Sequence, residues 1–292
     1  MRGSEESSRS VLKRTAIILC IIALVSGSAL ICFFLFQKPG AELVITDLDV
    51  GKADCAVLRY KDITGIIDTA EADDWGTIEA FLGKEGIDSF DYMILTHYDK
   101  DHIGNAVNIL EKYQVDRVYV PDYVSGKKHY KKLMEELEGR DDVIRLSQDE
   151  DILKLEELEI RVIPAEDPDS FDTEDNDYDN NMSLLSMITY GDSKFFFTGD
   201  IEKERISQII ESGEDINADW IKMPHHGSYE KRINKFLKAV SPIYSVISTS
   251  ADNPPDDKLI AVIDQNSIEN FDTIGGNVVT VGNGRDITVT KE

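Results

Sequence analysis

Three apolar segments that read as strands each run directly into residues that bind metals, and a predicted helix follows each of them. The first segment, residues 91–96, leads into His97, Asp99, Asp101 and His102 within six positions. On an extended chain His97 and Asp99 can point to the same side, while Asp101 and His102 fall in the turn before the helix. A helix cap would explain one aspartate but neither histidine. Imidazoles and carboxylates gathered at one strand end are what a divalent cation requires.

The other two segments place their polar residues in the same way. Residues 193–199 are followed by Asp200, and residues 218–223 are followed within three positions by the pair His225 and His226. The carboxyl ends of strands are where α/β folds collect their ligand-binding residues. Four of the five histidines of the chain lie in the three segments. The sequence therefore predicts one metal site built from three strand ends.

The remaining periodicity predicts an α/β domain. Runs of strands followed by strand–helix alternation occur twice, which fits two mixed sheets with helices outside better than one parallel doubly wound sheet. Gly191-Asp192 predicts a hairpin between two of the strands. The other predicted strands lie at 42–49, 54–60, 63–68, 117–121, 158–164, 183–191, 243–249, 277–282 and 286–290, and the helices at 74–85, 103–112, 128–138, 202–212, 231–239 and 256–269.

The N-terminal region predicts a membrane anchor. Residues 15–36 carry no charge, and a helix of that length spans the hydrocarbon core of a bilayer. A buried core helix and a cleaved signal peptide are the alternatives, but the run has no amphipathic stripe and is longer than a signal core. Four basic residues precede the run and only Lys38 closely follows it, which predicts a cytoplasmic N-terminus, a linker at 37–41 and a domain at 42–292 outside the cell.

The charge balance argues against tight binding to nucleic acid. The first 36 residues hold four basic and two acidic side chains of the total of 31 and 56, which leaves 27 and 54, a net charge of −27. A negative field of this size repels a phosphate backbone, and the sequence has no lysine- or arginine-rich stripe that could follow one. The alternative explanation of the charge is an adaptation for solubility. Residues 166–180 contain eight acids, which predicts a solvated loop, with a calcium site as the alternative.

Two residue types are left without a predicted role. Cys20, Cys32 and Cys55 suggest neither a disulfide framework nor a structural zinc site. His129 reads as a residue on a helix surface.

The motifs together resemble those of a known family. "IIDTA", "LTHYDKDHIGN", "FFFTGDI" and "IKMPHHGS" are similar to the metallo-β-lactamase superfamily, and "ITDLDVGKADCAVL" and "NNMSLLSMITYG" narrow the resemblance to the metallo-β-lactamase-like domain of ComEC-type competence proteins. The resemblance covers about residues 42–250 and implies a four-layer αββα sandwich. The channel-forming membrane region of ComEC is absent, and one anchor cannot form a DNA pore.

The resemblance also implies a role for each residue of the motifs. His97 and Asp99 would hold one metal, Asp101 and His102 the other, and Asp200 would bridge the two. The family pattern favours His226 over His225 as the last ligand of the second metal, with His225 as the alternative. Further residues in supporting positions would be Asp68, behind the ligands, and Asn180 or Asn181, in place of a histidine that this chain lacks.

These features predict a metal-dependent hydrolase. Carboxylate and amide ligands make the first site harder, which favours Mn²⁺ over Zn²⁺ for the two divalent ions. The ions would share an activated water, Asp101 would orient it, and the histidine of the 225–226 pair that is not a ligand would protonate the leaving group. The resemblance implies a membrane-anchored extracellular phosphodiesterase or nuclease, with DNA or another phosphodiester as partner. The alternatives are a hydrolase of a phosphorylcholine ester or a lactam, and a non-catalytic binding domain with a decayed site.

Overall fold

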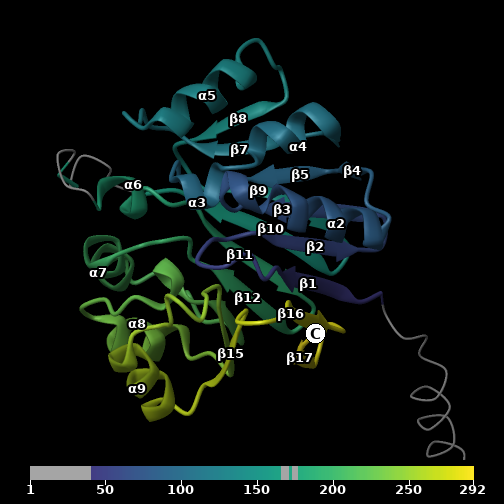
Figure 1. Ribbon diagram of the computed structural model, residues 1–292. Helices are drawn as coiled ribbons and strands as arrows, with labels where there is room; N and C mark the ends of the chain where they lie inside the picture. The colour runs from purple at the N-terminus through teal and green to yellow at the C-terminus, as the bar shows by residue number, and fades with distance from the viewer. Residues whose placement is uncertain (1–40, 166–170, 173–176) are drawn as a thin grey trace, which may run out of the picture. The chain divides into compact units, whose positions relative to one another are not determined.

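A computed structural model describes residues 41–165, 171–172 and 177–292, in which two mixed β-sheets lie against each other between layers of helices (Figure 1). The first sheet has eight strands. In spatial order they are β17 (Ile287–Lys291), β16 (Val278–Gly282), β1 (Leu43–Asp47), β2 (Ala56–Tyr60), β3 (Ile63–Ile67), β5 (Tyr92–Ile94), β7 (Val118–Pro121) and β8 (Val143–Leu146). The strands from β17 to β3 pair antiparallel, and those from β3 to β8 pair parallel.

The second sheet has seven strands. In spatial order they are β15 (Glu269–Asp272), β14 (Tyr244–Ile247), β13 (Trp220–Lys222), β12 (Ser193–Phe197), β11 (Leu185–Tyr190), β10 (Leu158–Ile163) and β9 (Glu150–Leu155). The strands from β15 to β12 pair parallel, and those from β12 to β9 pair antiparallel. A small parallel pair joins β4 (Ser89–Phe90) to β6 (Gln114–Val115).

Helices cover the outer face of each sheet (Figure 1). Those that pack on the first sheet are α2 (Trp75–Glu85), α4 (Ala106–Lys112) and α5 (Lys128–Leu137), and those on the second are α7 (Lys203–Ser212), α8 (Ile233–Val240) and α9 (Asp257–Gln265). Short helices occupy the loops between them: η1 (Ala72–Asp74), α3 (Lys100–Ile103), α6 (Tyr178–Asn181) and η3 (Pro224–Gly227).

The side chains of β12 show why this sheet is buried on both faces. Phe195 and Phe197 pack between the two sheets, while Phe196 packs against the outer helices with Phe236 of α8. Successive side chains of a strand point to opposite faces, so three phenylalanines in a row require apolar layers on both sides. The layers therefore run helices, sheet, sheet, helices, in agreement with the predicted α/β architecture.

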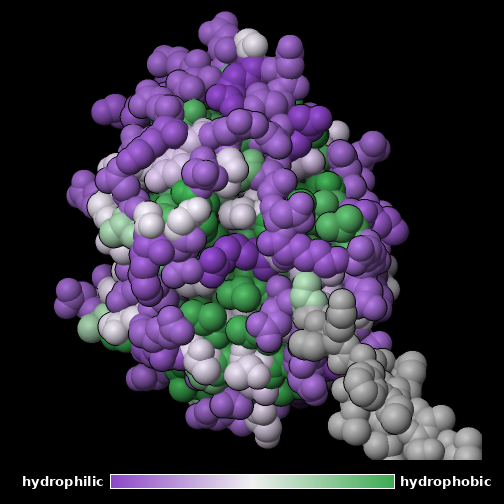
Figure 2. All heavy atoms as spheres, turned by 90° about the vertical axis from the view of Figure 1, so that its right-hand side faces the viewer, coloured by the Kyte–Doolittle hydropathy of each residue, from purple (hydrophilic) through white to green (hydrophobic). Residues whose placement is uncertain are grey.

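Most elements lie where periodicity predicted them, and the β11–β12 hairpin turns at Gly191 with φ +58°. The predicted helix 103–112 begins later, as α4, and the short helix α3 precedes it. Strands β8, β9 and β15 were missed. Each lies at the edge of its sheet, and nearly all of their side chains are exposed or half-buried. Hydrophilic side chains likewise cover most of the face shown in Figure 2, consistent with the acidic composition.

The predicted localisation needs correction. The proposed anchor at 15–36 lies outside the described residues, as do 166–170 and 173–176 of the acidic loop. Within the part of the chain that the structure describes, no helix is long and apolar enough to cross a membrane. The longest helix there, α2, has 11 residues, about half of what a bilayer requires. A single-pass protein with an extracellular domain is therefore not supported.

Candidate metal centre

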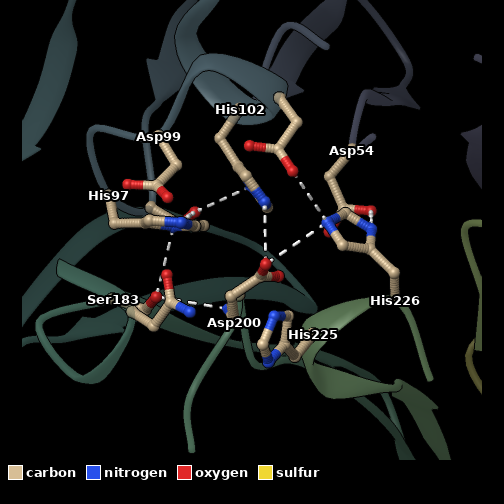
Figure 3. Close-up of polar contacts among 12 residues, drawn as sticks. Asp54, His97, Asp99, His102, Ser183, Asp200, His225 and His226 are labelled. Carbon is tan, nitrogen blue, oxygen red and sulfur yellow. Dashed lines mark hydrogen bonds and ion pairs between the residues drawn. The ribbon is translucent and has the colours of Figure 1, made fainter. Parts of the chain in front are cut away.

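The predicted metal-binding segments meet at the carboxyl ends of strands from both sheets (Figure 3). Strands β3 and β5 pair in parallel in the first sheet, as do β12 and β13 in the second. Their carboxyl ends therefore lie side by side, and the residues that follow them face a common space. This arrangement brings together side chains that are up to 158 positions apart, from Asp68 to His226.

Four residues form the centre of the site. Ligand atoms of Asp101, His102, Asp200 and His226 all lie within 4.8 Å of one another, and we call these residues the group of four. Asp200 Oδ2 is 3.2 Å from both His102 Nε2 and His226 Nε2, and Asp101 Oδ2 is 3.4 Å from His226 Nε2. Of the two adjacent histidines, only His226 belongs to this group.

The atoms that face the common space lack protein hydrogen bonds. The Nε2 atoms of His97, His102 and His226 and the Oδ1 atom of Asp200 are all buried without a hydrogen-bond partner. Leaving a buried polar atom unpaired costs about 1–3 kcal/mol, so four such atoms at one place need an explanation. A divalent cation would satisfy imidazole nitrogens and carboxylate oxygens together, and the residues fit one.

Asp68 orients His102 from behind. Its Oδ2 accepts a hydrogen bond from His102 Nδ1 at 2.7 Å, and its two oxygens also accept from the backbone N–H and hydroxyl of Thr96 at 2.8 and 2.7 Å. In the neutral ring, with Nδ1 donating, the lone pair of His102 is on Nε2, the atom that faces the group of four. Asp68 thus holds this imidazole in the form that binds a metal.

A second carboxylate lies behind His226. This carboxylate is that of Asp54, whose Oδ1 is 3.5 Å from His226 Nδ1. The same nitrogen is 3.2 Å from the carbonyl oxygen of Ser248. Asp54 is in turn paired with the buried ammonium of Lys222, at 2.8 and 3.0 Å. Sequence reasoning missed Asp54 and Lys222, although both lie inside motifs quoted above, because neither is next to a histidine at a strand end.

Backbone geometry explains why the two adjacent histidines separate. His225 and His226 both have left-handed backbones, with φ of +49° and +51°, and Gly227 follows at φ +83°. Such conformations are costly for residues with a Cβ and tend to occur at functional sites. The turn directs His226 to the group of four, while His225 Nδ1 lies 3.3 Å from Glu202 Oε1 and 4.0 Å from Glu230 Oε1.

The remaining predicted ligands are only partly assembled. His97 lies beside His102, with ring centroids 4.1 Å apart, and its Nδ1 is 3.1 Å from Thr96 Oγ1. Asp99, however, bonds to Lys127. The two asparagines predicted to replace a histidine ligand both contact the start of α7. Asn180 Nδ2 donates to Glu202, and Asn181 Oδ1 accepts from the backbone N–H groups of Glu202 and Arg205.

Electrostatics indicate that the imidazoles of the group of four hold protons when no metal is bound. Burial alone would lower the pKa values of His102 and His226, but the carboxylates around them, Asp200 foremost, raise both well above the usual range. Burial would raise the pKa of Asp101, yet the contacts with His226 and His102 lower it to about 2. Burial lowers the pKa of His97. Without a metal, the site therefore holds protons that a cation must displace.

A protein-family model identifies the superfamily of this chain. The model of the metallo-β-lactamase superfamily matches residues 48–251. The chain belongs to the metallo-β-lactamase superfamily. Solved structures agree at the level of the fold: the metallo-β-lactamase fold protein YhfI of Bacillus subtilis has a TM-score of 0.55 at 14% identity, over 83% of this chain and 100% of that one. Igni18, a metallo hydrolase from Ignicoccus hospitalis, has a TM-score of 0.53 at 17% identity, over 81% and 98%.

Within the superfamily, the curated relatives are competence and recombination proteins, as the narrower resemblance predicted. The ComE operon protein 3 of Bacillus subtilis is 31% identical over 194 residues, which are 64% of this chain and 24% of that protein. The competence protein ComA of Neisseria gonorrhoeae is 24% identical over 74% of this chain and 28% of its own length. The chain thus spans about a quarter of the length of these relatives.

A cleft opens beside the site of this metallo-β-lactamase domain. It has a volume of about 140 Å³ and adjoins His226. The remaining residues that line it are Lys52, Gly227, Ser228, Asn253, Pro254 and Asp256. Lys52 is exposed, so the cleft offers a positive charge next to the site in a domain that is otherwise strongly acidic.

Proposed function

We propose that this domain is a metal-dependent hydrolase that cleaves phosphodiesters at the group of four. The observation that carries the proposal is the set of buried, unpaired nitrogen and oxygen atoms of His97, His102, His226 and Asp200 around one space. The similarity to a competence protein, a ComE operon protein and a recombination protein favours a phosphodiester over other substrates. A decayed binding domain is disfavoured, because selection for packing alone would not keep these atoms unpaired.

The candidate ligands form two sets, one for each of two metal ions. The group of four would hold one divalent ion, and His97 and Asp99 would contribute to a second. When bound, such ions polarise a phosphoryl oxygen and lower the pKa of water, which is the chemistry that a phosphodiester requires. Carboxylate oxygens make up half of the group of four, which favours Mn²⁺ over a strictly zinc-type site.

Asp101 is the residue best placed to orient the attacking water. Its side chain is 23% exposed, whereas those of His102, Asp200 and His226 are almost fully buried, so it is the member of the group that substrate and water can reach. With a pKa of about 2 it is ionised at neutral pH. We infer that it accepts a hydrogen bond from the attacking water and so orients it.

His225 and Glu202 form the second part of the proposed mechanism. Burial lowers the pKa of His225, so that the ring is neutral near pH 7, whereas burial raises the pKa of Glu202 to about 8. The proton in this pair is therefore on Glu202, which lies 3.3 Å from His225 Nδ1, although without hydrogen-bond alignment. Through His225, the pair would supply a proton to the leaving oxygen.

The cleft limits the part of the substrate that is held. A volume of about 140 Å³ with one lysine accommodates one or two phosphate groups and no long duplex. The net charge of −27 for residues 37–292 opposes contacts farther along a nucleic acid. Binding should therefore have a shallow salt dependence, equivalent to one or two phosphates, and single-stranded or short substrates should be cut at least as well as duplex DNA.

The test is hydrolysis by the 292-residue protein of labelled single- and double-stranded DNA, a small aryl phosphodiester and a lactam, with Mn²⁺ or Zn²⁺ and across a salt series. We expect phosphodiester cleavage that a chelator abolishes and Mn²⁺ restores. Asp200→Asn should lower kcat by about 10²-fold or more, because Asp200 contacts both imidazoles. His129→Ala, on α5, should leave the rate unchanged.

The small cleft also favours a second candidate, a hydrolase of a small ester or lactam. Rapid lactam or ester hydrolysis without DNA cleavage would select this candidate over the first. If Asp200→Asn retains most of the activity, the group of four is not the catalytic centre.

A further inference from the structure

Asp99, the carboxylate predicted to bind a metal together with His97, is already paired with a lysine. Lys127 Nζ bonds Asp99 Oδ1 and lies 3.1 Å from Asp179 Oδ2. Lys127 is the residue just before α5, and Asp99 the residue just before α3. The ammonium thus lies between two carboxylates, one of which is two positions from His97.

The surroundings of Lys127 hold it in this place. Its backbone N–H donates to Ser125 Oγ at 3.2 Å, and that hydroxyl donates to Asp179 Oδ2 at 2.8 Å. Ser125 and Asp179 are both buried, and the Lys127 side chain is 40% exposed. A lysine anchored at its backbone and at its ammonium differs from a surface lysine that meets a carboxylate by chance.

The two predicted ligand sets are therefore unequal. The group of four brings its ligand atoms within 4.8 Å of one another, whereas in the described ranges His97 and Asp99 belong to no cluster of three or more metal-binding side chains. Asn181, a predicted substitute ligand, uses its Oδ1 atom to accept two backbone N–H groups of α7. The set of His97 and Asp99 therefore offers His97 Nε2, which has no hydrogen-bond partner, and Asp99, which is already paired with Lys127.

We propose that Lys127 takes the place of the second divalent ion. The protein then binds one cation firmly at the group of four, and a second one near His97 and Asp99 only by displacing the Lys127 ammonium. The inference rests on the proposed function, since it concerns the same metal centre. Its physical basis is that two positive charges at contact distance from one carboxylate repel each other, so occupancy by one weakens the other.

The number and affinity of bound ions test this directly. Mn²⁺ alone is titrated into the metal-free 292-residue protein by calorimetry, and electron paramagnetic resonance distinguishes isolated from coupled Mn²⁺. For the unaltered protein we expect one firmly bound ion and a second site weaker by about tenfold or more. Lys127→Met, which removes the charge but keeps most of the side chain, should strengthen the second site by about tenfold and produce coupled ions.

Two variants serve as controls. Lys127→Arg retains the charge and should bind as the unaltered protein does. Lys128→Met removes a neighbouring exposed lysine and should also have no effect. Two equally firm sites in the unaltered protein, or an unchanged second site in Lys127→Met, would overturn the role of Lys127 while leaving the proposed hydrolase intact. Absence of any bound ion would overturn both.

Discussion

Each imidazole of the group of four is held between carboxylates on both ring nitrogens. His102 contacts Asp68 through Nδ1 and Asp200 through Nε2, and His226 contacts Asp54 and Asp200 in the same way. This arrangement raises the pKa of both rings, because the protonated form is surrounded by negative charge. At the scale of single residues, protons and metal ions therefore compete for the same atoms.

The competition predicts a metal affinity that rises with pH. Below their raised pKa values, His102 and His226 hold the protons that a cation must displace, so the affinity for Mn²⁺ should rise by up to about tenfold per pH unit for each displaced proton until the pH reaches those pKa values. Calorimetry at pH 6.5 and 8.5, in buffers of different ionisation enthalpy, measures the affinity and the protons released. An affinity that does not depend on pH would contradict the raised pKa values.

The same linkage applies to stability without metal. A histidine whose pKa is raised in the folded state stabilises that state below its unfolded pKa, and this contribution is lost as pH rises through the folded pKa. The metal-free protein should therefore lose thermal stability from these two groups on the alkaline side of the usual histidine range.

At the scale of elements, the η3 turn decides which histidine faces the site. Gly227 has φ +83°, and a Cβ there would lie 2.6 Å from Pro255 Cβ and 3.0 Å from Ile247 Cγ2. Neither neighbour is the far end of a flexible side chain. The left-handed turn that separates His225 from His226 therefore depends on a glycine at its end.

Gly227→Ala should destabilise the protein by about 1–3 kcal/mol and weaken metal binding, because the strain acts on the residue after His226. Chemical denaturation and Mn²⁺ titration measure the two effects. Gly83→Ala is the matched control: Gly83 lies in α2, no atom is within 4 Å of its Cβ position, and the change should stabilise by about 0.5–1 kcal/mol. Equal effects of the two substitutions would show that the turn carries no strain.

At the scale of the whole molecule, a buried ion pair joins the two sheets. Asp54 precedes β2 of the first sheet, and Lys222 ends β13 of the second. Their side chains are only 9% and 4% exposed. Nearby Asp47, at the end of β1, has two buried oxygens without a partner, and burial raises its pKa to about 7. The charge of Lys222 therefore balances acidic groups from the facing sheet.

Lys222→Met should lower the free energy of unfolding by about 3–5 kcal/mol, since it leaves Asp54 buried without its counter-charge. The exposed pair Arg232–Glu211 provides the control, and Arg232→Met should cost about 1 kcal/mol or less. Urea denaturation measures both. The double variant with Asp54→Asn should cost less than the sum of the single changes. A cost for Lys222→Met as small as the control would exclude a structural role for the pair.

Local sequence determined the layers and the location of the site. Periodicity places a strand before each cluster of histidine and aspartate, and turn chemistry places the hairpin at Gly191, because both depend on residues a few positions apart. The family followed from the same motifs. The polar edge strand β9 escaped prediction, since an edge strand exposes its side chains and loses the apolar signal. The predicted membrane localisation, drawn from the apolar run and the basic residues before it, needed correction, since no helix among the described residues could cross a membrane.

Tertiary structure decided which of the candidate side chains face one another. The backbone of η3 directs His226 and not His225 to Asp200. Lys127, 28 positions from Asp99, reaches that carboxylate because the loop before α5 lies beside the one before α3. Lys222 meets Asp54 over 168 positions because the two sheets pack face to face. Such contacts depend on the packing of whole layers, and no local pattern of residues encodes them.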